Sequence, residues 1–359
     1  MNKIRVLVVD DSALMRKMIP RMLKTDPGIE VVGTAMDGVF ALSKIRDLRP
    51  DVVTLDMDMP RMDGMETLRH IVEDFGIPTI VVSSLAKKDA ELTFRALNIG
   101  AFDFVAKPRD AISLHINEID RELIEKIRAA SQNPVARLRI KKVQSLNPRE
   151  NKKHPAVKPA DKLLVIGIST GGPNALSYLL PRLPEDFPAS ILIVQHMPAG
   201  FTEMFASRLN TTCGIEVKEA REGDLVLPGR ALIAPGSQHL KIKRLPLGTI
   251  AVLSSAAPVN GHKPSADVLF RSAAEEYGPM VTGLIMTGMG ADGAQGMSEI
   301  RENGGFTIAQ DEKSCVVFGM PKAAVERGAI KQIVALEEMA DHLIQRFCWK
   351  EKEYGTVRN

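Results

Sequence analysis

The sequence has few cysteines and no long apolar run. Its three cysteines, Cys213, Cys315 and Cys348, are far apart and have neither the spacing of zinc ligands nor that of a redox pair. No apolar run approaches the ~20 residues that a membrane span requires. The opening stretch MNKIRVLVVDDS turns acidic and has no small-residue cleavage site, so we interpret it as a buried strand rather than a signal peptide. We therefore expect reduced, structural cysteines and a cytoplasmic protein that is not inserted in a membrane.

A net positive charge is confined to one segment. The net charge is +3, but residues 126–162 hold eleven Lys or Arg against two Asp or Glu, so the remainder of the chain is acidic. The same segment contains four prolines and few large apolar residues, which is typical of a solvated linker. A nucleic-acid-binding arm is the alternative, but interleaved aromatic residues are missing. We predict a basic linker over 126–160 between domains at 1–125 and 161–348, and no nucleic-acid partner.

Short β-branched runs alternate with amphipathic stretches in the first 125 residues. This alternation predicts βαβ units on a five-stranded parallel sheet. A last helix is expected near Asp110–Arg128, where isoleucines and leucines recur at intervals of three and four. Pro20 is discordant because it lies within an otherwise helical stretch, Ala13–Lys24. The predicted strands are Ile4–Asp10, Val31–Ala35, Val52–Asp56, Thr79–Ser83 and Phe102–Ala106.

The alternation resumes after the linker and continues to about Phe347. The apolar bursts LLVIGIS, SILIVQH, ALIAPG and GLIMTG each precede a polar or glycine-rich turn, as buried parallel strands do. The stretch HLKIKRLPLGTIAVLSS predicts a hairpin at one edge of the sheet. We expect a doubly wound, mostly parallel α/β domain with an edge hairpin.

Charged side chains follow three of the strands predicted in the first domain. Asp10 and Asp11 end the first strand, Asp56 the third, and Lys107 the fifth, while Ser83 ends the fourth. The carboxyl ends of parallel strands converge on one crevice, where three carboxylates need a hard cation such as Mg²⁺. Asp56 could attack phosphorus there and become an aspartyl phosphate. Solvated loop charges would explain any one of these residues, but not all five in register.

The motifs VLVVDDS, TLDMDMPRMDG, VVSS and DFVAKP resemble the signature of response-regulator receiver domains over residues 1–125. The resemblance implies a flavodoxin-like fold that is phosphorylated on Asp56 by a chemotaxis histidine kinase. It further implies that Ser83 and Phe104, with Lys107, relay phosphorylation to the surface. The Mg²⁺ ligands that it implies are Asp11, Asp56 and the backbone carbonyl of Asp58, assisted by Asp10.

Residues 167–171 fit the G-x-S-x-G pattern of a serine nucleophile between a strand and a helix. A glycine-rich phosphate-binding turn is the alternative, but neither a P-loop lysine nor G-x-G-x-x-G is present. Ser169 needs a base and an orienting carboxylate. We predict His196, at the end of SILIVQH, and Asp292, in the turn after GLIMTG; His239 and His262 are weaker candidates for the base.

The order Ser, His, Asp differs from that of α/β-hydrolases, and no HGGG-type loop precedes Ser169. The motifs GISTGGP, VQHMP, HKPSADVLF and MTGMGADG resemble instead the protein-glutamate methylesterase of bacterial chemotaxis, over residues 161–348. The resemblance implies a Ser169, His196 and Asp292 triad that needs no metal, with Thr170 and the Met289 amide near the oxyanion.

The same resemblance implies hydrolysis of glutamate methyl esters, and deamidation of glutamines, on methyl-accepting chemoreceptors. It also implies a receiver that covers the active site until it is phosphorylated. Two other classes of function are the alternatives to this one. A DNA-binding response regulator would have a smaller, basic helical output domain. An inert α/β binding module would have no need of His196 and Asp292.

Overall fold

The computed structural model describes residues 3–84, 87–107, 116–132 and 161–348. Its first sheet is five-stranded and parallel, in the order β2-β1-β3-β4-β5. Each strand lies within two residues of its predicted bounds, because short apolar runs that end at Asp, Gly or Ser leave little freedom in placing them. The strands are β1 (Ile4–Val9), β2 (Ile29–Ala35), β3 (Val52–Leu55), β4 (Thr79–Ser83) and β5 (Asp103–Ala106).

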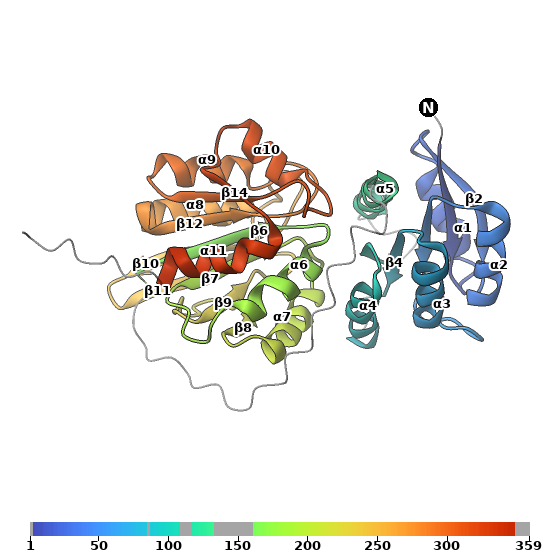
Figure 1. Cartoon of the computed structure of the whole chain (residues 1–359), viewed down its shortest axis with the longest axis horizontal. Helices are drawn as coiled ribbons and strands as arrows, with labels where there is room; N and C mark the ends of the chain where they lie inside the picture. Colours follow the sequence, from blue (N-terminus) through green and yellow to red (C-terminus); the bar gives the residue numbers. More distant parts are fainter. Residues whose placement is uncertain (1–2, 85–86, 108–115, 133–160, 349–359) are drawn as a thin grey trace, which may run out of the picture.

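Helices cover this sheet (Figure 1). Pro20 lies inside α1, which continues through it and so lacks the hydrogen bond that a residue with an N–H would donate there. The last helix, α5, continues to Gln132, so residues 126–132, which fall within the predicted linker, are helical. Residues 133–160 lie outside the described part of the chain. The helical segments are α1 (Met15–Leu23), α2 (Gly38–Leu48), α3 (Gly64–His70), η1 (Ile71–Phe75), α4 (Lys87–Ile99) and α5 (Ile116–Gln132).

The second domain is built on a seven-stranded sheet in the order β14-β13-β12-β6-β7-β9-β8, in which every pairing is parallel. After β6 the chain adds β7, β8 and β9 on one side of that strand, and then adds β12, β13 and β14 on the other side. The carboxyl ends of β6, β7 and β12 therefore meet at the reversal point, where open α/β sheets bind ligands. The strands are β6 (Leu163–Ile168), β7 (Ser190–Gln195), β8 (Glu216–Glu219), β9 (Arg230–Ile233), β12 (Val281–Ile285), β13 (Phe306–Gln310) and β14 (Gln332–Val334).

The predicted hairpin is present, but it forms a sheet of its own rather than an edge of the large one. Strands β10 (His239–Leu245) and β11 (Gly248–Ser254) form a two-stranded antiparallel sheet, and β10 packs against α8. On its other side β11 makes an isolated antiparallel bridge, from Ile250 to Leu225. Alternation predicts which residues of a strand are buried, but not which sheet it joins. The helices of this domain are α6 (Gly172–Leu179), η3 (Leu180–Arg182), α7 (Phe201–Thr212), α8 (Ala266–Tyr277), η4 (Gly278–Met280), α9 (Ala294–Glu302), α10 (Met320–Glu326) and α11 (Leu336–Cys348).

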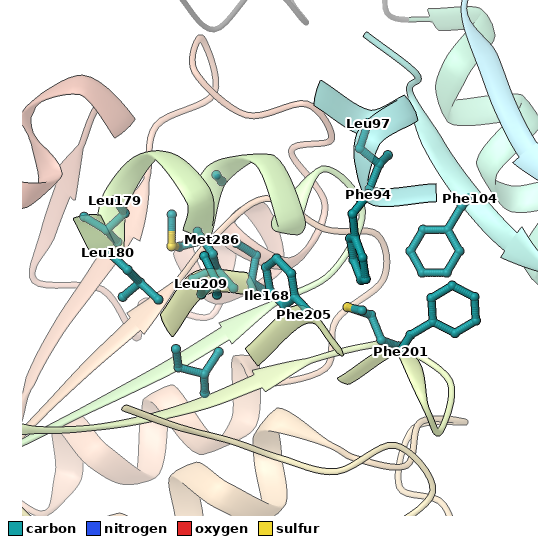
Figure 2. Close-up of a cluster of buried hydrophobic side chains, with 14 of the residues drawn as sticks. Phe94, Leu97, Phe104, Ile168, Leu179, Leu180, Phe201, Phe205, Leu209 and Met286 are labelled. Carbon is teal, nitrogen blue, oxygen red and sulfur yellow. The ribbon is translucent and has the colours of Figure 1, made fainter. Parts of the chain in front are cut away.

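The two domains share an aromatic contact (Figure 2). Phe104, on β5, stacks on Phe201 of α7 with ring centroids 4.7 Å apart. Phe94, on α4, stacks on Phe205 of α7 at 5.4 Å. All four rings are buried, at 3% exposure or less. The interface is therefore apolar where these four rings meet.

Candidate functional sites

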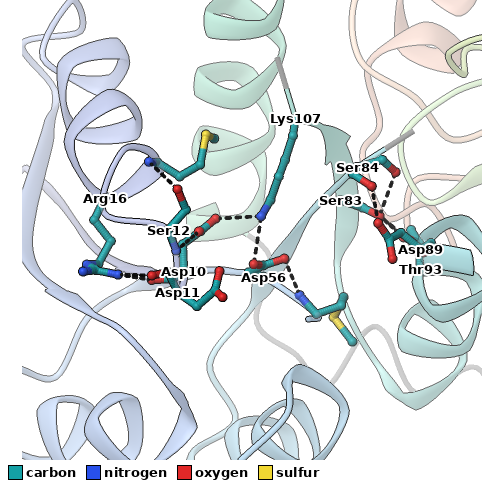
Figure 3. Close-up of polar contacts among 12 residues, drawn as sticks. Asp10, Asp11, Ser12, Arg16, Asp56, Ser83, Ser84, Asp89, Thr93 and Lys107 are labelled. Atoms are coloured by element: carbon teal, nitrogen blue, oxygen red, sulfur yellow. Dashed lines mark hydrogen bonds and ion pairs between the residues drawn. The ribbon is translucent and has the colours of Figure 1, made fainter. Parts of the chain in front are cut away.

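The acidic residues predicted at the strand ends of the first domain do meet (Figure 3). Lys107 Nζ lies 2.8 Å from Asp56 Oδ2 and 3.0 Å from Asp10 Oδ2. One carboxylate oxygen from each of Asp10, Asp11 and Asp56 lies within 4.8 Å of the others. Arg16 holds the loop by donating hydrogen bonds to the backbone oxygens of Asp10 and Asp11. The pocket thus gathers three anionic groups and one cation.

The electrostatics of this pocket favour a divalent cation. Burial and the nearby Asp10 raise the pKa of Asp56 while Lys107 lowers it, and together these effects bring it to about 6. Burial also raises the pKa of Asp10. One ammonium group is therefore too little positive charge for the cluster, and a Mg²⁺ ion with its preference for carboxylate oxygens fits the donor set. Asp58, the further ligand predicted through its backbone, is exposed in the loop after β3.

The two predicted switch residues lie between this pocket and the second domain. Ser83 is buried, and its Oγ accepts a hydrogen bond of 2.7 Å from Thr93 on α4. Its backbone oxygen accepts from the Lys107 amide at 2.7 Å. Phe104, on the neighbouring strand β5, is the ring that stacks on Phe201 of α7. A chain of contacts therefore joins Lys107, through Ser83 and α4, to the domain interface.

Ser169 lies in a sharp turn between β6 and α6, as the G-x-S-x-G pattern predicts. Its N–H donates to Thr287 O at 3.0 Å, and its carbonyl accepts from the Gly172 amide at 2.7 Å. Gly171 has φ +75°, a conformation that side chains other than glycine rarely adopt. Ser169 is half-buried. Its two backbone hydrogen bonds fix the turn and so place the hydroxyl at the carboxyl end of β6, the central strand.

His196 follows β7, the strand next to β6. Ile168 pairs with Gln195 in the register of the two strands, which places Ser169 beside His196. His196 Nε2 hydrogen-bonds Asp292 Oδ2 at 2.8 Å. Its Nδ1 is buried and has no hydrogen-bond partner among the described residues. No hydrogen bond joins Ser169 Oγ to this nitrogen in the described part of the chain, so that contact remains a prediction; such contacts often form only with substrate bound.

Asp292 is fully buried and ringed by donors. Ser265 Oγ donates to its Oδ1 at 2.6 Å, and the Ala266 amide donates to its Oδ2 at 2.7 Å. Burial alone would raise the pKa of Asp292, but the hydrogen bonds from His196, Ser265 and Ala266 hold it at about 2. Asp292 is therefore an anion at neutral pH that fixes the Nε2–H form of His196, leaving Nδ1 as the basic nitrogen.

The two alternative bases are placed differently. His239 is buried, its Nδ1 accepts from the Ser265 amide at 3.2 Å, and its Nε2 is 3.0 Å from Ala257 O. Both of its nitrogens are occupied, so it cannot serve as the base for Ser169. The His262 ring instead lies flat against His196, with centroids 4.0 Å apart and an interplanar angle of 9°.

Thr170 and Met289, predicted near the oxyanion, both lie beside the Ser169 turn. Thr170 is buried, and its carbonyl accepts a hydrogen bond of 2.9 Å from Thr287 Oγ1. Gly288, which precedes Met289, is so close that an added Cβ would lie 2.8 Å from Ser169 Cβ. The loop after β12 therefore passes directly beside the hydroxyl-bearing turn.

Sequence reasoning missed Gln195, the buried residue that precedes His196. Its Nε2 donates to Ser169 O at 3.1 Å and to His196 O at 3.2 Å, so one amide clamps the two residues that must meet. It also missed Ser265, although both positions lie within motifs quoted above, VQHMP and HKPSADVLF. The signal that could have identified Gln195 and Ser265 is that each is a polar residue within a motif otherwise expected to be buried.

Within the described ranges, no helix has the length and apolar character needed to cross a membrane. Residues 164–343 match the family model of the CheB methylesterase, and residues 6–117 match that of the response regulator receiver domain. Two curated relatives are named protein-glutamate methylesterase/protein-glutamine glutaminase. The one from Koribacter versatilis is 56% identical over 95% of each chain, and the one from Pyrococcus horikoshii is 44% identical over 96% of this chain and 94% of its own.

A solved structure agrees with these matches. The catalytic domain of the Thermotoga maritima CheB methylesterase is 41% identical to this chain, covers 53% of it and 100% of its own length, and superposes with a TM-score of 0.51. The similarity to the curated relatives extends over both domains. This chain, with a receiver domain ahead of a seven-stranded hydrolytic domain, belongs to the CheB methylesterase family.

Proposed function

We propose that this protein hydrolyses glutamate methyl esters on chemoreceptors, and deamidates receptor glutamines, with Ser169 as the nucleophile. The observation that carries the proposal is the buried His196–Asp292 pair, which lies at the end of the strand beside Ser169 and leaves His196 Nδ1 without a hydrogen-bond partner in the described ranges. An acyl-transfer site needs a hydroxyl, a base and an orienting anion at one place. The names and extent of the relatives support the ester and amide substrates.

In the proposed mechanism Ser169 Oγ attacks the ester carbonyl while its proton passes to His196 Nδ1. Asp292 stabilises the imidazolium that forms. The tetrahedral intermediate collapses, and His196 returns the proton to the departing methoxide, which leaves as methanol. Water then attacks the acyl-enzyme by the same route and releases the glutamate carboxylate; with glutamine as substrate, ammonia leaves instead of methanol. Thr170 and the Met289 amide are proposed to bind the oxyanion.

Substitution of the nucleophile tests this proposal. Ser169→Ala should lower methanol release from methylated receptor membranes by more than a thousandfold, because loss of a nucleophile costs at least that much. Ser177→Ala is a matched control, since Ser177 lies on the helix that follows and its Oγ bonds only Pro173 O within the described chain. More than about a thousandth of the wild-type rate in Ser169→Ala would rule out a serine mechanism.

We further propose that phosphorylation of Asp56 by a histidine kinase activates the hydrolytic domain. Asp10, Asp11 and Asp56 would hold Mg²⁺, which when bound neutralises phosphoryl oxygens beside Lys107. The receiver contacts the hydrolytic domain in two places that support occlusion. One is the aromatic contact with α7. The other is a cluster in which Val316, Val317 and Met289, beside the Ser169 turn, pack with receiver residues.

Methanol release with and without a small phosphodonor tests the regulation. The unphosphorylated chain should be slow, and the phosphodonor should accelerate it. A fragment that begins near Asp161 should be active without a phosphodonor, because the covering domain is gone. A fragment less active than the full unphosphorylated chain would contradict simple occlusion.

A further inference from the structure

We propose that His262 is a positioning residue for the reaction, whose ring stacks on His196 and holds it in the plane that directs Nδ1 toward Ser169. The proposal rests on the proposed function above, since it assigns a role within that triad. It starts from the parallel contact between the two rings, whose centroids are 4.0 Å apart at an interplanar angle of 9°.

The backbone places His262 with little freedom. Val259 and His262 exchange two backbone hydrogen bonds, of 3.1 and 2.9 Å, across a tight turn. The two residues between them, Asn260 and Gly261, have φ +53° and +78°, as the central residues of such a turn require. Asn260 Nδ2 also donates to Asp267 Oδ2 at 2.6 Å, which ties the turn to the start of α8.

The same segment carries the donors of Asp292. Ser265 and Ala266 lie three and four residues after His262, and they donate hydrogen bonds to the two carboxylate oxygens of Asp292. One stretch of chain, residues 259–267, therefore holds both members of the His196–Asp292 pair. Asp292 hydrogen-bonds the edge of the His196 ring at Nε2, and the His262 ring covers one face of the His196 ring. A hydrogen bond at one edge leaves the ring free to rock about that bond, and a flat neighbour removes this freedom.

The charge state of His262 suits the role. Burial, with the nearby charges of His196 and Arg121, lowers the pKa of His262 to about 4, although Asp292 acts in the opposite sense. His262 is therefore uncharged at pH 7. A neutral ring can lie against His196 when it becomes positively charged during the reaction, whereas a second cation there would oppose proton transfer from Ser169.

Two variants of the full-length protein separate stacking from other roles. His262→Phe keeps a flat ring without nitrogens, and His262→Ala removes the ring. With a phosphodonor present and methylated receptors as substrate, His262→Ala should lower kcat about tenfold with KM within about twofold of wild type. His262→Phe should retain at least a third of the wild-type kcat. Melting temperatures identify any variant that loses folding rather than alignment, and His262→Phe alone still tests the proposal if His262→Ala does not fold.

The second measurement is the rate at which a serine-directed phosphonylating reagent labels Ser169. This rate should follow the order of kcat, with wild type fastest, His262→Phe next and His262→Ala slowest. Wild-type kcat in His262→Ala would overturn the proposal. So would a folded His262→Phe as slow as His262→Ala, because the imidazole nitrogens would then be needed. A raised KM with unchanged kcat would make His262 a substrate-binding residue instead. If the wild-type protein is labelled at Ser169 but releases no methanol, the proposed substrate fails while the labelling still tests His262.

Discussion

Replacing Phe104 by leucine should raise the activity of the unphosphorylated protein. Phe104 contributes one ring to the stacked pair with Phe201, at a centroid distance of 4.7 Å and an interplanar angle of 25°. An aromatic pair of this kind contributes about 0.5–1.5 kcal/mol beyond its buried area. Leucine fills most of the space but cannot stack. If the covered state predominates, losing this term increases the fraction of open molecules roughly 2- to 12-fold.

The measurement is methanol release from methylated receptors without a phosphodonor, compared between wild type and Phe104→Leu. Phe75→Leu serves as the control, because Phe75 belongs to the same domain but has no ring contact with α7. The fully phosphorylated rate should change little, since the proposed regulation has the interface open in that state. An unchanged basal rate in Phe104→Leu, with the variant folded, would show that the aromatic contact does not limit access to the site.

Three other predictions concern the two sites. Asp292→Asn should lower kcat by about 10⁴, as loss of the orienting anion does in serine hydrolases, and a loss of less than tenfold in methanol release would remove Asp292 from the triad. Asp56→Asn should abolish stimulation by a phosphodonor without changing the basal rate, and a chelator should do the same to the wild type; persistent stimulation would place the phosphate elsewhere. His262 has a pKa of about 4 in the folded chain, below its ordinary 6.5. As the pH falls, this histidine is therefore protonated in the unfolded chain before it is protonated in the folded chain, which favours unfolding. Relative to His262→Phe, the wild type should lose about 2 kcal/mol of unfolding free energy between pH 7 and pH 4.5, and urea titrations that show no such difference would contradict this.

The sequence predicts the strands well, and with them which polar side chains gather at the strand ends, for one physical reason. Short apolar runs must be buried, and the polar residue that ends each run lies at an edge of the sheet. Asp56 and Lys107, at the ends of β3 and β5, then come together whatever the intervening loops do. Asp292 lies further along, in the turn after β12, and this turn brings it to His196. Ser169 is predicted more sharply, because the turn that holds it requires small residues on both sides.

The features that the sequence could not predict depend on backbone groups and on contacts between distant residues, which leave no recognisable sequence pattern. The Ala266 amide bonds Asp292, and any residue could supply such an amide. The hairpin of β10 and β11 follows strand periodicity, but its packing against α8 depends on contacts distant in the chain. Helix α5 ends at Gln132, beyond the predicted Arg128, because its last four residues, Ala-Ala-Ser-Gln, have no large apolar side chain to extend the isoleucine and leucine spacing used for the prediction.

The glycines of GISTGG show how one motif can contain several separate requirements. At Gly167 an added Cβ would lie 2.9 Å from Ala266 Cβ, so a side chain there would push away the segment that bonds Asp292. Gly171 is needed for its positive φ. At Gly172 an added Cβ would lie 1.9 Å from Gln195 Oε1, in the space of the amide that clamps Ser169 to His196. The motif therefore specifies more than a sharp turn for the nucleophile. Two of its glycines make room for the groups that hold the base and its carboxylate in register with Ser169.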